Sequence, residues 1–478
     1  MENLIGRIHE LGELKESLES KRSEFVILYG RRRVGKTFLV RKFFNDQYTF
    51  HFVGAHGKKT KHQLKYFQEA LQRYSNNNIP TLKNWHEAFL QLEHYLETCK
   101  EQRKVLFFDE MPWIDAQKSD FVEELEYFWA SWVQNRDDIV FIACGSATTW
   151  MKEKLEDNQG GLHNRITRRI YLRPFYLSEC RSYLKANGFD WDEYMIMQSY
   201  MIFGGVPYYL SLLKNNLSLV ENVDSLIFRI GGNLSDEFNE LYNALFKKAD
   251  RYIKIVKFLA TKREGFTKTE IANSTGFSGG GLTKMLDNLE RCDFIISYVQ
   301  FGNKTKQTIY RLCDFFTLFY LRYANNNSKD EHYWQHHFQD RSVSSWEGFS
   351  FEELCLRHLP HIKHGLGISG IATEASSWRY LPQQKNNTER GAQVDLVISR
   401  ADKIIHLCEM KFSSTYYAIS KDYAERLTQR RLQFMEANRL SRGAVITFIT
   451  PYGLQQGINT SLVHSSLTSS HLFAEILE

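Results

Sequence analysis

The sequence has little of what marks membrane, secreted or disordered proteins. No apolar run approaches the roughly 18 residues of a membrane-spanning helix, and the first residues, MENLIGR, meet charge too early for a secretory signal. The seven cysteines are scattered without a C-x-x-C pair, which argues against a disulfide framework and a zinc knuckle. There are only 7 prolines and 28 glycines, and no low-complexity tract or internal repeat. These absences predict a cytoplasmic protein with reduced thiols and no membrane contact.

The rest of the composition is that of an ordinary globular protein, with 43% hydrophobic and 24% charged residues. A length of 478 residues predicts about three domains, because a domain averages roughly 150 residues. The net charge of +5 is mild for this length. It permits a nucleic-acid partner but does not argue for one.

Residues 30–37, GRRRVGKT, match the phosphate-binding motif GxxxxGK(S/T). The apolar run 25–29 leads in as a strand and residues 37–45 lead out as a helix, a setting that a chance glycine-rich turn does not explain. The glycines let backbone amides point at a β-phosphate, and the helix N-terminus adds partial positive charge. Lys36 is expected to reach the β- and γ-phosphates and Thr37 to ligate Mg²⁺, so the chain is expected to bind ATP or GTP. The predicted nucleotide contacts are Gly30, Arg31, Arg32, Arg33, Val34, Gly35, Lys36, Thr37 and Phe38.

Two acids end a second apolar run, VLFFDE at 105–110. Four apolar residues followed by two carboxylates are typical of a buried parallel strand that delivers its acids at the C-terminal edge of a sheet. We predict that Asp109 holds Mg²⁺, usually through water, and that Glu110 polarises the water that attacks the γ-phosphate. An apolar strand can end in Asp-Glu by chance. Downstream of a phosphate loop, however, the pair favours a hydrolase over a passive nucleotide binder.

Two later positions are candidate parts of the same site. Ser146 follows an expected buried strand at 139–144, where additional-strand P-loop ATPases have a polar residue that senses the γ-phosphate. The alternative is that Ser146 or Thr148 caps the next helix. Arg165 precedes an expected strand at 170–172, and an arginine here can neutralise a transferring phosphoryl group, often across a subunit interface. Arg168 is the second choice, and ordinary surface arginines are the alternative.

Taken together, these motifs resemble archaeal-type ATPases of the STAND branch of the AAA-like, additional-strand P-loop ATPases. The resemblance lies in the phosphate loop, the acids at 109–110, Arg165 before LRPF at 172–175, and GGVPYYL at 204–210. It implies a helical lid in which Pro207 lies near the nucleotide and senses its presence. The alternative is a simple helix break, which Gly-Gly and Pro produce in any protein. A homo-oligomer with nucleotide at its subunit interfaces is also expected.

The middle of the chain has the pattern of a winged helix. Apolar spacing marks one helix near 253–259, TKTE at 267–270 opens a second with a capping box, and 281–291 supplies a third. Residues 294–298 and 307–312 are the expected wing strands. The module offers few cations for phosphate contacts, so a structural or protein-contact role is favoured over DNA reading.

Acids and a lysine also gather near two strands in the C-terminal part. With a three-residue turn at 400–402, the two strands place Asp395 on the same sheet face as Glu409 and Lys411. Together with Glu352 on a preceding helix, this pattern resembles the core of PD-(D/E)xK nucleases. The same letters also occur by chance on ordinary amphipathic hairpins.

Each of these residues has an expected role in phosphodiester hydrolysis. Asp395 and Glu409 are expected to bind Mg²⁺, which polarises the phosphodiester and generates hydroxide. Lys411 is expected to position the attacking water or to stabilise the charge of the transition state. Glu352 would complete the site.

The predicted fold is therefore α/β, a P-loop NTPase of the additional-strand class with a helical lid, a winged-helix module and a C-terminal α/β restriction-endonuclease-like domain. The predicted function is ATP hydrolysis that controls or powers Mg²⁺-dependent action on DNA. The alternative is an ATP-gated regulator or scaffold that binds DNA or protein without cutting. A helicase-like motor is less attractive, because no helicase motif is present beyond those that P-loop ATPases share. The predicted domains are 1–175 for the ATPase core, 176–248 for the lid, 249–325 for the winged helix, 326–345 for a linker and 346–478 for the nuclease-like domain.

Overall fold

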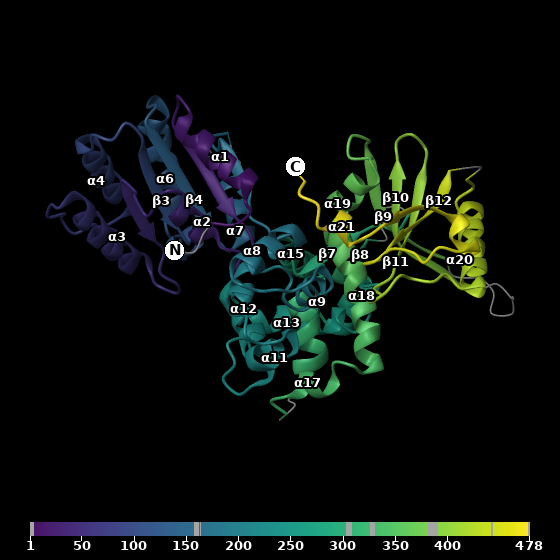
Figure 1. Ribbon diagram of the computed structural model, residues 1–478. Coiled ribbons are helices and arrows are strands. Elements are labelled where there is room, and N and C mark those ends of the chain that lie inside the picture. The colour runs from purple at the N-terminus through teal and green to yellow at the C-terminus, as the bar shows by residue number, and fades with distance from the viewer. Residues whose placement is uncertain are drawn as a thin grey trace. The chain divides into compact units, whose positions relative to one another are not determined.

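The chain divides into two units, residues 1–174 and 175–478 (Figure 1). The division falls beside residue 175, where the ATPase core was predicted to end. The computed structural model describes residues 4–156, 162, 164–302, 308–325, 330–380, 391–440 and 443–476. Among the helices in these ranges, none combines the length and the apolar character needed to cross a lipid bilayer.

A five-stranded parallel sheet forms the middle of the first unit, in the order β2-β3-β4-β1-β5. Strands β1 (Glu24–Tyr29), β3 (Lys104–Asp109) and β4 (Ile139–Gly145) are buried along their whole length, as expected for apolar runs inside a parallel sheet. Strands β2 (Phe50–Val53) and β5 (Arg168–Tyr171) form the edges. Strand β4 lies between β1 and β3, the arrangement that the predicted additional-strand class requires.

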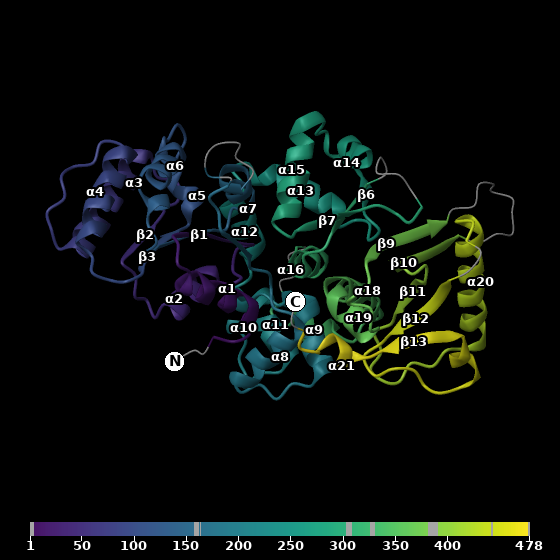
Figure 2. The ribbon, with the colours of Figure 1, turned by 90° about the horizontal axis from the view of Figure 1, so that it is seen from above.

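Helices cover both faces of this sheet (Figure 2). Helices α1 (Ile8–Glu19) and α2 (Lys36–Phe43) pack on one face, and α3 (Thr60–Ser75), α4 (Trp85–Thr98) and α6 (Phe121–Ser131) pack on the other. Successive side chains of β1 belong alternately to the two hydrophobic clusters, as strand geometry requires. The shorter elements are α5 (Met111–Ile114), η1 (Val133–Asn135), α7 (Thr148–Met151) and the π-helical turn η2 (Lys152–Glu156).

The second unit begins with short helices. Gly204 ends α9 with a left-handed φ of 66°, and Pro207 is the first residue of α10. Glycine tolerates the left-handed conformation at a helix end. Proline suits the first position of a helix, because the N–H that it lacks would have no partner there. The predicted helix break is confirmed. The elements of this part are α8 (Leu177–Ala186), α9 (Glu193–Phe203), α10 (Pro207–Ser211), α11 (Leu219–Val223), η3 (Asp224–Phe228) and α12 (Glu237–Leu245).

A small antiparallel sheet follows, in the order β6-β8-β7. The helices and the strand pair expected for this region are present, and Thr267 and Glu270 form the predicted capping box. Strand β6 was not predicted from the sequence. The elements are α13 (Ala249–Leu259), β6 (Phe266–Thr267), α14 (Lys268–Thr275), α15 (Gly279–Arg291), β7 (Ile295–Tyr298) and β8 (Ile309–Leu312).

The linker predicted at 326–345 is wrong for its described part. This stretch contains a short helix and the start of a long one, in which Trp334 and Val343 are buried. The carboxylate of buried Asp224 accepts hydrogen bonds from the amides of Trp334 (2.7 Å) and Gln335 (3.0 Å), which fixes the stretch to η3. Polar residues suggested a linker, but the aromatic residues behind them enter the core. The elements are α16 (Phe315–Phe319), η5 (Tyr320–Ala324), α17 (Tyr333–His337), α18 (Arg341–Arg357) and α19 (Leu359–Gly365).

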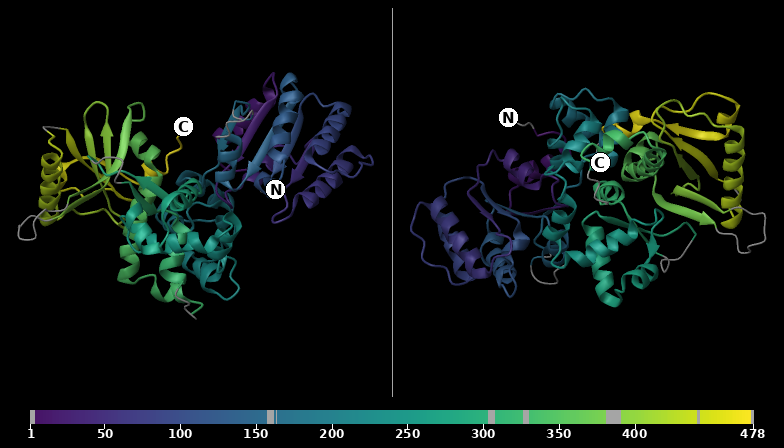
Figure 3. Two further views of the ribbon diagram at one scale, coloured as in Figure 1. Left: turned by 180° about the vertical axis from the view of Figure 1, so that it is seen from behind. Right: turned by 90° about the horizontal axis from the view of Figure 1, so that it is seen from below.

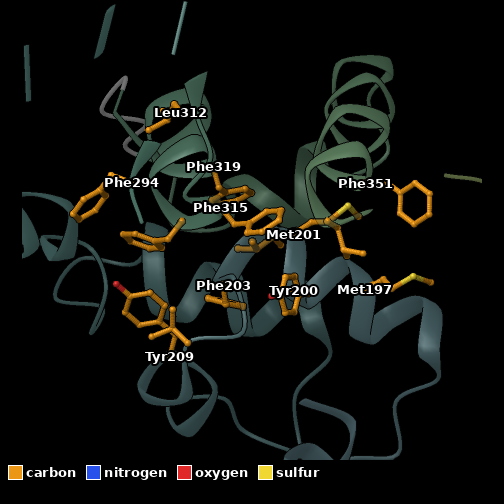
Figure 4. Packing of buried hydrophobic residues seen from close by; sticks show 14 of the residues in the cluster. Met197, Tyr200, Met201, Phe203, Tyr209, Phe294, Leu312, Phe315, Phe319 and Phe351 are labelled. Carbon is orange, nitrogen blue, oxygen red and sulfur yellow. The ribbon is translucent and has the colours of Figure 1, made fainter. Parts of the chain in front are cut away.

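A mixed sheet in the order β13-β12-β11-β10-β9 ends the chain, antiparallel from β9 to β11 and parallel from β11 to β13. Helix α18 packs on one face, and α20 runs along the other (Figures 1 and 3). One hydrophobic cluster joins the short helices to α18 and this sheet; Figure 4 shows Tyr200, Phe315 and Phe351 within it. The elements are β9 (Thr373–Tyr380), β10 (Ala392–Arg400), β11 (Ile405–Met410), α20 (Lys421–Ala437), β12 (Ala444–Ile449), η6 (Ile458–Leu462), β13 (Val463–Leu467) and α21 (Ser469–Leu472).

A buried histidine makes this sheet sensitive to pH. His406 on β11 is 2% exposed, and its Nδ1 lies 2.9 Å from Thr447 Oγ1. Burial, and next the positive charge of Arg400, lower the pKa of His406 to about 4. Histidine in an unfolded chain has a pKa of about 6.5. As the pH falls below that value, the unfolded chain therefore binds the proton before the folded one does.

The second unit is accordingly expected to lose stability as the pH falls from about 6.5 toward about 4. The free energy of unfolding, measured with urea, should be about 2 kcal/mol lower near pH ~5 than near pH ~8. His406→Gln should remove this part of the pH dependence, whereas His364→Gln, at an exposed position on α19, should retain it. An unchanged pH dependence in His406→Gln would contradict the assignment.

Candidate functional site

The predicted phosphate loop connects β1 to α2 at the C-terminal edge of the parallel sheet. Gly30 (φ 151°) and Gly35 (φ 91°) adopt backbone conformations that favour glycine, and Gly35 is the N-cap of α2. Lys36 Nζ donates to the carbonyl oxygens of Gly30 (3.0 Å) and Arg31 (2.9 Å). The loop therefore curls around the ammonium group of Lys36, which is buried.

A residue before the first strand also supports this loop. Arg7 is 5% exposed, and its guanidinium donates to the carbonyl of Val34 at 3.2 Å. The same guanidinium pairs with Glu10 at 3.6 Å. The motif itself gives no signal for Arg7, because the contact joins residues far apart in the sequence.

Thr37 and Asp109 lie side by side. The Thr37 hydroxyl donates to Asp109 Oδ2 at 2.8 Å, and Asp109 is 4% exposed at the end of β3. Parallel strands end at the same edge of a sheet, which is why the loop after β1 meets the acid after β3. A hydroxyl and a carboxylate are oxygen donors of the kind that Mg²⁺ prefers, so the pair fits the ion. Burial raises the pKa of the neighbouring Cys144 thiol.

Glu110 and Ser146 form a second pair beside the first. Glu110 has a positive φ of 45°, which is uncommon for a residue with a side chain and is often found at functional sites. The Ser146 hydroxyl donates to the Glu110 carboxylate, at 2.9 Å to Oε2 and 3.2 Å to Oε1. The N-cap of α7 is Ala147, which makes no side-chain capping bond, so the capping alternative for Ser146 and Thr148 is wrong. Ser146 instead orients Glu110.

The predicted arginines differ in their surroundings. Arg165 lies in a turn, half-buried, with its amide bonded to the Leu162 carbonyl at 2.9 Å. Its predicted role concerns a neighbouring subunit and stays a prediction. Arg168, the second choice, pairs with Glu13 and Glu16 on α1, each at 2.9 Å, and thus joins β5 to that helix.

The remaining predicted nucleotide contacts lie in three places. Arg31 and Val34 are buried within the loop, while Arg32 and Arg33 are partly exposed there. Phe38 is 36% exposed on the first turn of α2. Pro207 belongs to the second unit, and its role as a sensor stays a prediction.

The second group of predicted residues lies on β10 and β11. The pairing of β10 with β11 runs from Leu396 and Cys408 to the turn, and β10 is irregular between Val394 and Val397. Asp395 therefore lies toward α18, where it shares Arg263 with Glu352, whereas Glu409 contacts Tyr423 and Arg430 of α20 on the other face of the sheet. The prediction that Asp395 shares one face with Glu409 and Lys411 is wrong. The connecting turn lies at 401–403, one residue later than predicted.

Glu409 is surrounded by hydrogen-bond donors. Its carboxylate contacts Lys411 Nζ at 2.7 Å and an Arg430 amino group at 2.6 Å, and it accepts from the Tyr423 hydroxyl. Burial, and next the charge of Glu409, raise the pKa of Tyr423, so this hydroxyl remains a donor. Neither Tyr423 nor Arg430 was assigned to this group from the sequence. Their spacing of seven residues on α20 places both on one helical face.

Asp395 and Glu352 share one partner. The Arg263 guanidinium lies 3.0 Å from Asp395 Oδ1 and also contacts Glu352. Gln393 Nε2 donates to the same Asp395 oxygen at 2.7 Å. Within the described ranges, no three His, Cys, Asp or Glu side chains are arranged to hold a metal ion. Metal binding by these acids therefore stays a prediction.

The loop, the acids at the ends of neighbouring strands and the order of the sheet define the first unit as a P-loop ATPase. Residues 4–213 match the family described as an ATPase domain predominantly from Archaea. The chain therefore contains an archaeal-type ATPase domain, binds ATP and is an ATP-hydrolysing enzyme.

Two relatives come from Methanocaldococcus jannaschii. The uncharacterized protein MJECL04 is 26% identical over 413 residues, which cover 85% of this chain and 87% of the relative. The uncharacterized ATP-binding protein MJ0423 is 42% identical over 43 residues, which cover 9% of this chain and 73% of the relative.

Three solved structures are similar to the chain. The Walker-type ATPase PABY2304 of Pyrococcus abyssi has a TM-score of 0.48 and 20% identity, covering 67% of this chain and 96% of that one. The ORC2 protein of Aeropyrum pernix, in ADPNP–ADP complexes, has a TM-score of 0.40 and 14% identity, with coverages of 68% and 96%. The STAND protein PH0952 of Pyrococcus horikoshii, which has a tetratricopeptide repeat sensor, has a TM-score of 0.31 and 18% identity. The match covers 76% of this chain and 51% of that one. The assignment rests on the family match and the site geometry.

Proposed function

We propose that this ATPase uses its nucleotide cycle to control or power Mg²⁺-dependent action on DNA by its C-terminal sheet. The proposed parts are a STAND-type core of the additional-strand class, a helical lid, a winged-helix module and a PD-(D/E)xK nuclease-like domain. The observation that supports the nuclease half is the placement of the acids on one helix and two neighbouring strands, with Glu352 on α18, Asp395 on β10 and Glu409 on β11.

The proposed mechanism of ATP hydrolysis uses Lys36 and the residue pairs Thr37–Asp109 and Glu110–Ser146 at the C-terminal edge of the parallel sheet. Lys36, already inside the loop, would contact the β- and γ-phosphates. Thr37 and Asp109 are the residues that would hold Mg²⁺, whose chemistry is to neutralise charge on those phosphates. Glu110, oriented by Ser146, would accept a proton from the attacking water and so act as the general base. Arg165 would complete the site of a neighbouring copy in a homo-oligomer.

The nuclease half assigns one role to each residue of the second group. Asp395 and Glu409 would hold Mg²⁺, which polarises a phosphodiester and lowers the pKa of water. Lys411, 2.7 Å from Glu409, would position the attacking water and stabilise the negative charge of the transition state. Glu352 on α18 would orient this group from the helix side.

A second function has its own supporting observation. All three acids of the nuclease-like group are paired with basic side chains, Glu352 and Asp395 with Arg263 and Glu409 with Lys411 and Arg430. Such pairing suits an ATP-gated regulator or scaffold that binds DNA or protein without cutting it.

A cleavage assay separates the two functions. We expect the wild-type protein with Mg²⁺ or Mn²⁺ to nick or linearise plasmid DNA in at least one nucleotide state. Asp395→Asn should lower the cleavage rate by about a hundredfold, because it removes a charged metal ligand. Asp402→Asn is the matched control, since Asp402 is an exposed residue at the turn of the same hairpin. DNA binding without cleavage under every metal and nucleotide condition would favour the regulator.

A further inference from the structure

A pocket in the second unit brings three arginines together. It lies between the small antiparallel sheet and β9, the first strand of the C-terminal sheet. Arg263 comes from the segment before β6, Arg311 from β8 and Arg379 from β9. Because these segments are far apart in the sequence, the group exists only in the folded unit.

The two walls of this pocket are joined by backbone and aromatic contacts. Gln300 forms a β-bridge with Ser377, and the Phe301 amide donates to the Ser377 carbonyl at 2.7 Å. The Phe301 ring packs against Phe434 of α20, with ring centroids 5.0 Å apart. The small sheet is therefore docked on the C-terminal sheet, and the arginines on the two walls keep their positions relative to each other.

Neighbouring acids orient two of the arginines and leave donors over. Arg311 Nη2 lies 2.8 Å from a carboxylate oxygen of Glu353, which is 7% exposed. Arg263 contacts Asp395, at 3.0 Å, and Glu352 through its own Nη2. A guanidinium has five N–H donors, so these ion pairs do not use all of them. The Nε of Arg311 is buried and has no hydrogen-bond partner among the described residues. A buried donor without a partner is destabilising, and an oxygen atom of a ligand would satisfy it.

Two charges in the pocket lining have no partner in the described ranges. The guanidinium of Arg379 is exposed, and the carboxylate of Glu264 is half-buried. Arginine recognises phosphate oxygens, whereas an ionised glutamate accepts hydrogen bonds and repels a bare anion. The lining therefore suits a ligand that carries a phosphate group and, beside it, a hydroxyl or amino group. A nucleotide has both.

We propose that this pocket binds the phosphate group of a nucleotide, either free or at the end of a nucleic-acid chain. Arg311 and Arg379 donate to the phosphate oxygens, and Glu264 accepts from a hydroxyl of the sugar. The site is separate from the phosphate loop of the first unit. Such binding does not require that the C-terminal sheet cuts DNA.

The affinity for cytidine monophosphate tests this proposal. It is measured by isothermal titration in full-length Lys36→Ala, so that the phosphate loop does not contribute. In that background Arg379→Gln should weaken binding by about tenfold, because it removes a charge-assisted hydrogen bond. Arg311→Lys keeps the charge beside Glu353 but loses Nε, and it should weaken binding as well. Arg341→Gln, at an exposed position at the start of α18, is the matched control and should bind as the background does.

Sulfate separates the two parts of the recognition. It is an anion without a hydrogen to donate, so Glu264→Ala should weaken binding of the nucleotide but not of sulfate. An oligonucleotide with and without a terminal phosphate, followed by fluorescence anisotropy, identifies the source of the ligand. Tighter binding of the phosphorylated form that depends on Arg379 supports a chain end, and equal binding of the two forms supports a free nucleotide.

Two results would overturn the phosphate site. One is that the Lys36→Ala background binds no cytidine monophosphate, and the other is that Arg379→Gln and Arg311→Lys bind it as tightly as the background does. Circular dichroism melts of each variant check that the fold is intact. DNA cleavage enters none of these measurements, so their failure is distinguishable from a failure of the proposed nuclease.

Discussion

Replacing Lys36 by alanine is expected to reduce ATP hydrolysis by about a thousandfold. The ammonium group is buried and bonded to two carbonyl oxygens of its own loop, so it is already oriented where phosphate oxygens would lie. Alanine removes both the charge that would stabilise the transferring phosphoryl group and the contact that shapes the loop. Release of inorganic phosphate from ATP, measured with saturating Mg²⁺, gives the rate.

Lys65→Ala is the matched control for this experiment. Lys65 lies on α3 of the same unit, its side chain is 69% exposed, and it pairs only loosely with Glu69 at 3.8 Å. Its hydrolysis rate should equal that of the wild type. Turnover in Lys36→Ala at the wild-type rate would refute the role given to the phosphate loop.

Replacing Glu110 by glutamine should also slow hydrolysis by about a thousandfold, but it should leave ATP binding nearly unchanged. Glutamine keeps the shape and the hydrogen bond from Ser146 while losing the basic oxygen that would accept a proton from water. Isothermal titration with ATP and Mg²⁺ measures the affinity, and phosphate release measures the turnover.

Glu123→Gln, at an exposed position on α6, makes the same chemical change away from the site and should affect neither quantity. Parallel loss of binding and turnover in Glu110→Gln would mean that Glu110 holds the loop together and is not the general base. Unchanged turnover would contradict the assignment in a different way, because the proton acceptor would then have to be another group.

Much of the first site could be predicted from the sequence because its functional residues lie directly at the ends of apolar strands. A phosphate loop after one apolar run and two acids after another must meet if both runs enter the same parallel sheet. The 2.8 Å contact between Thr37 and Asp109 is the result. The partnership of Ser146 with Glu110 could not be read in this way, because it depends on the unusual backbone of Glu110.

The second site was harder to predict because its partners come from distant segments. Two apolar runs and a short turn were enough to predict that β10 and β11 pair. The irregularity between Val394 and Val397, which turns Asp395 toward α18 and away from the face of Glu409, could not be predicted from the sequence. Arg263 contacts Asp395 and Glu352 from a distant segment of the chain, and the residues around Arg263 in the sequence do not predict an acidic partner. Nothing in the sequence singled out Tyr423 on its amphipathic helix as a partner of Glu409. Residues 333–345 were taken for a linker, although their aromatic side chains bind them to the core.

The proposed link between the two sites needs an element with two positions. A nucleotide can shift such an equilibrium only if it favours one position over the other.

The rate of plasmid cleavage in Mg²⁺ as a function of nucleotide tests most directly whether the ATPase controls the C-terminal domain. Wild type, Lys36→Ala and Glu110→Gln are each assayed with ATP, with ADP and without nucleotide. ATP is expected to change the wild-type cleavage rate by about tenfold or more, whereas Lys36→Ala is expected to cleave at one rate under all three conditions. Equal cleavage by wild type in all three conditions would contradict the claim that the ATPase controls the C-terminal domain.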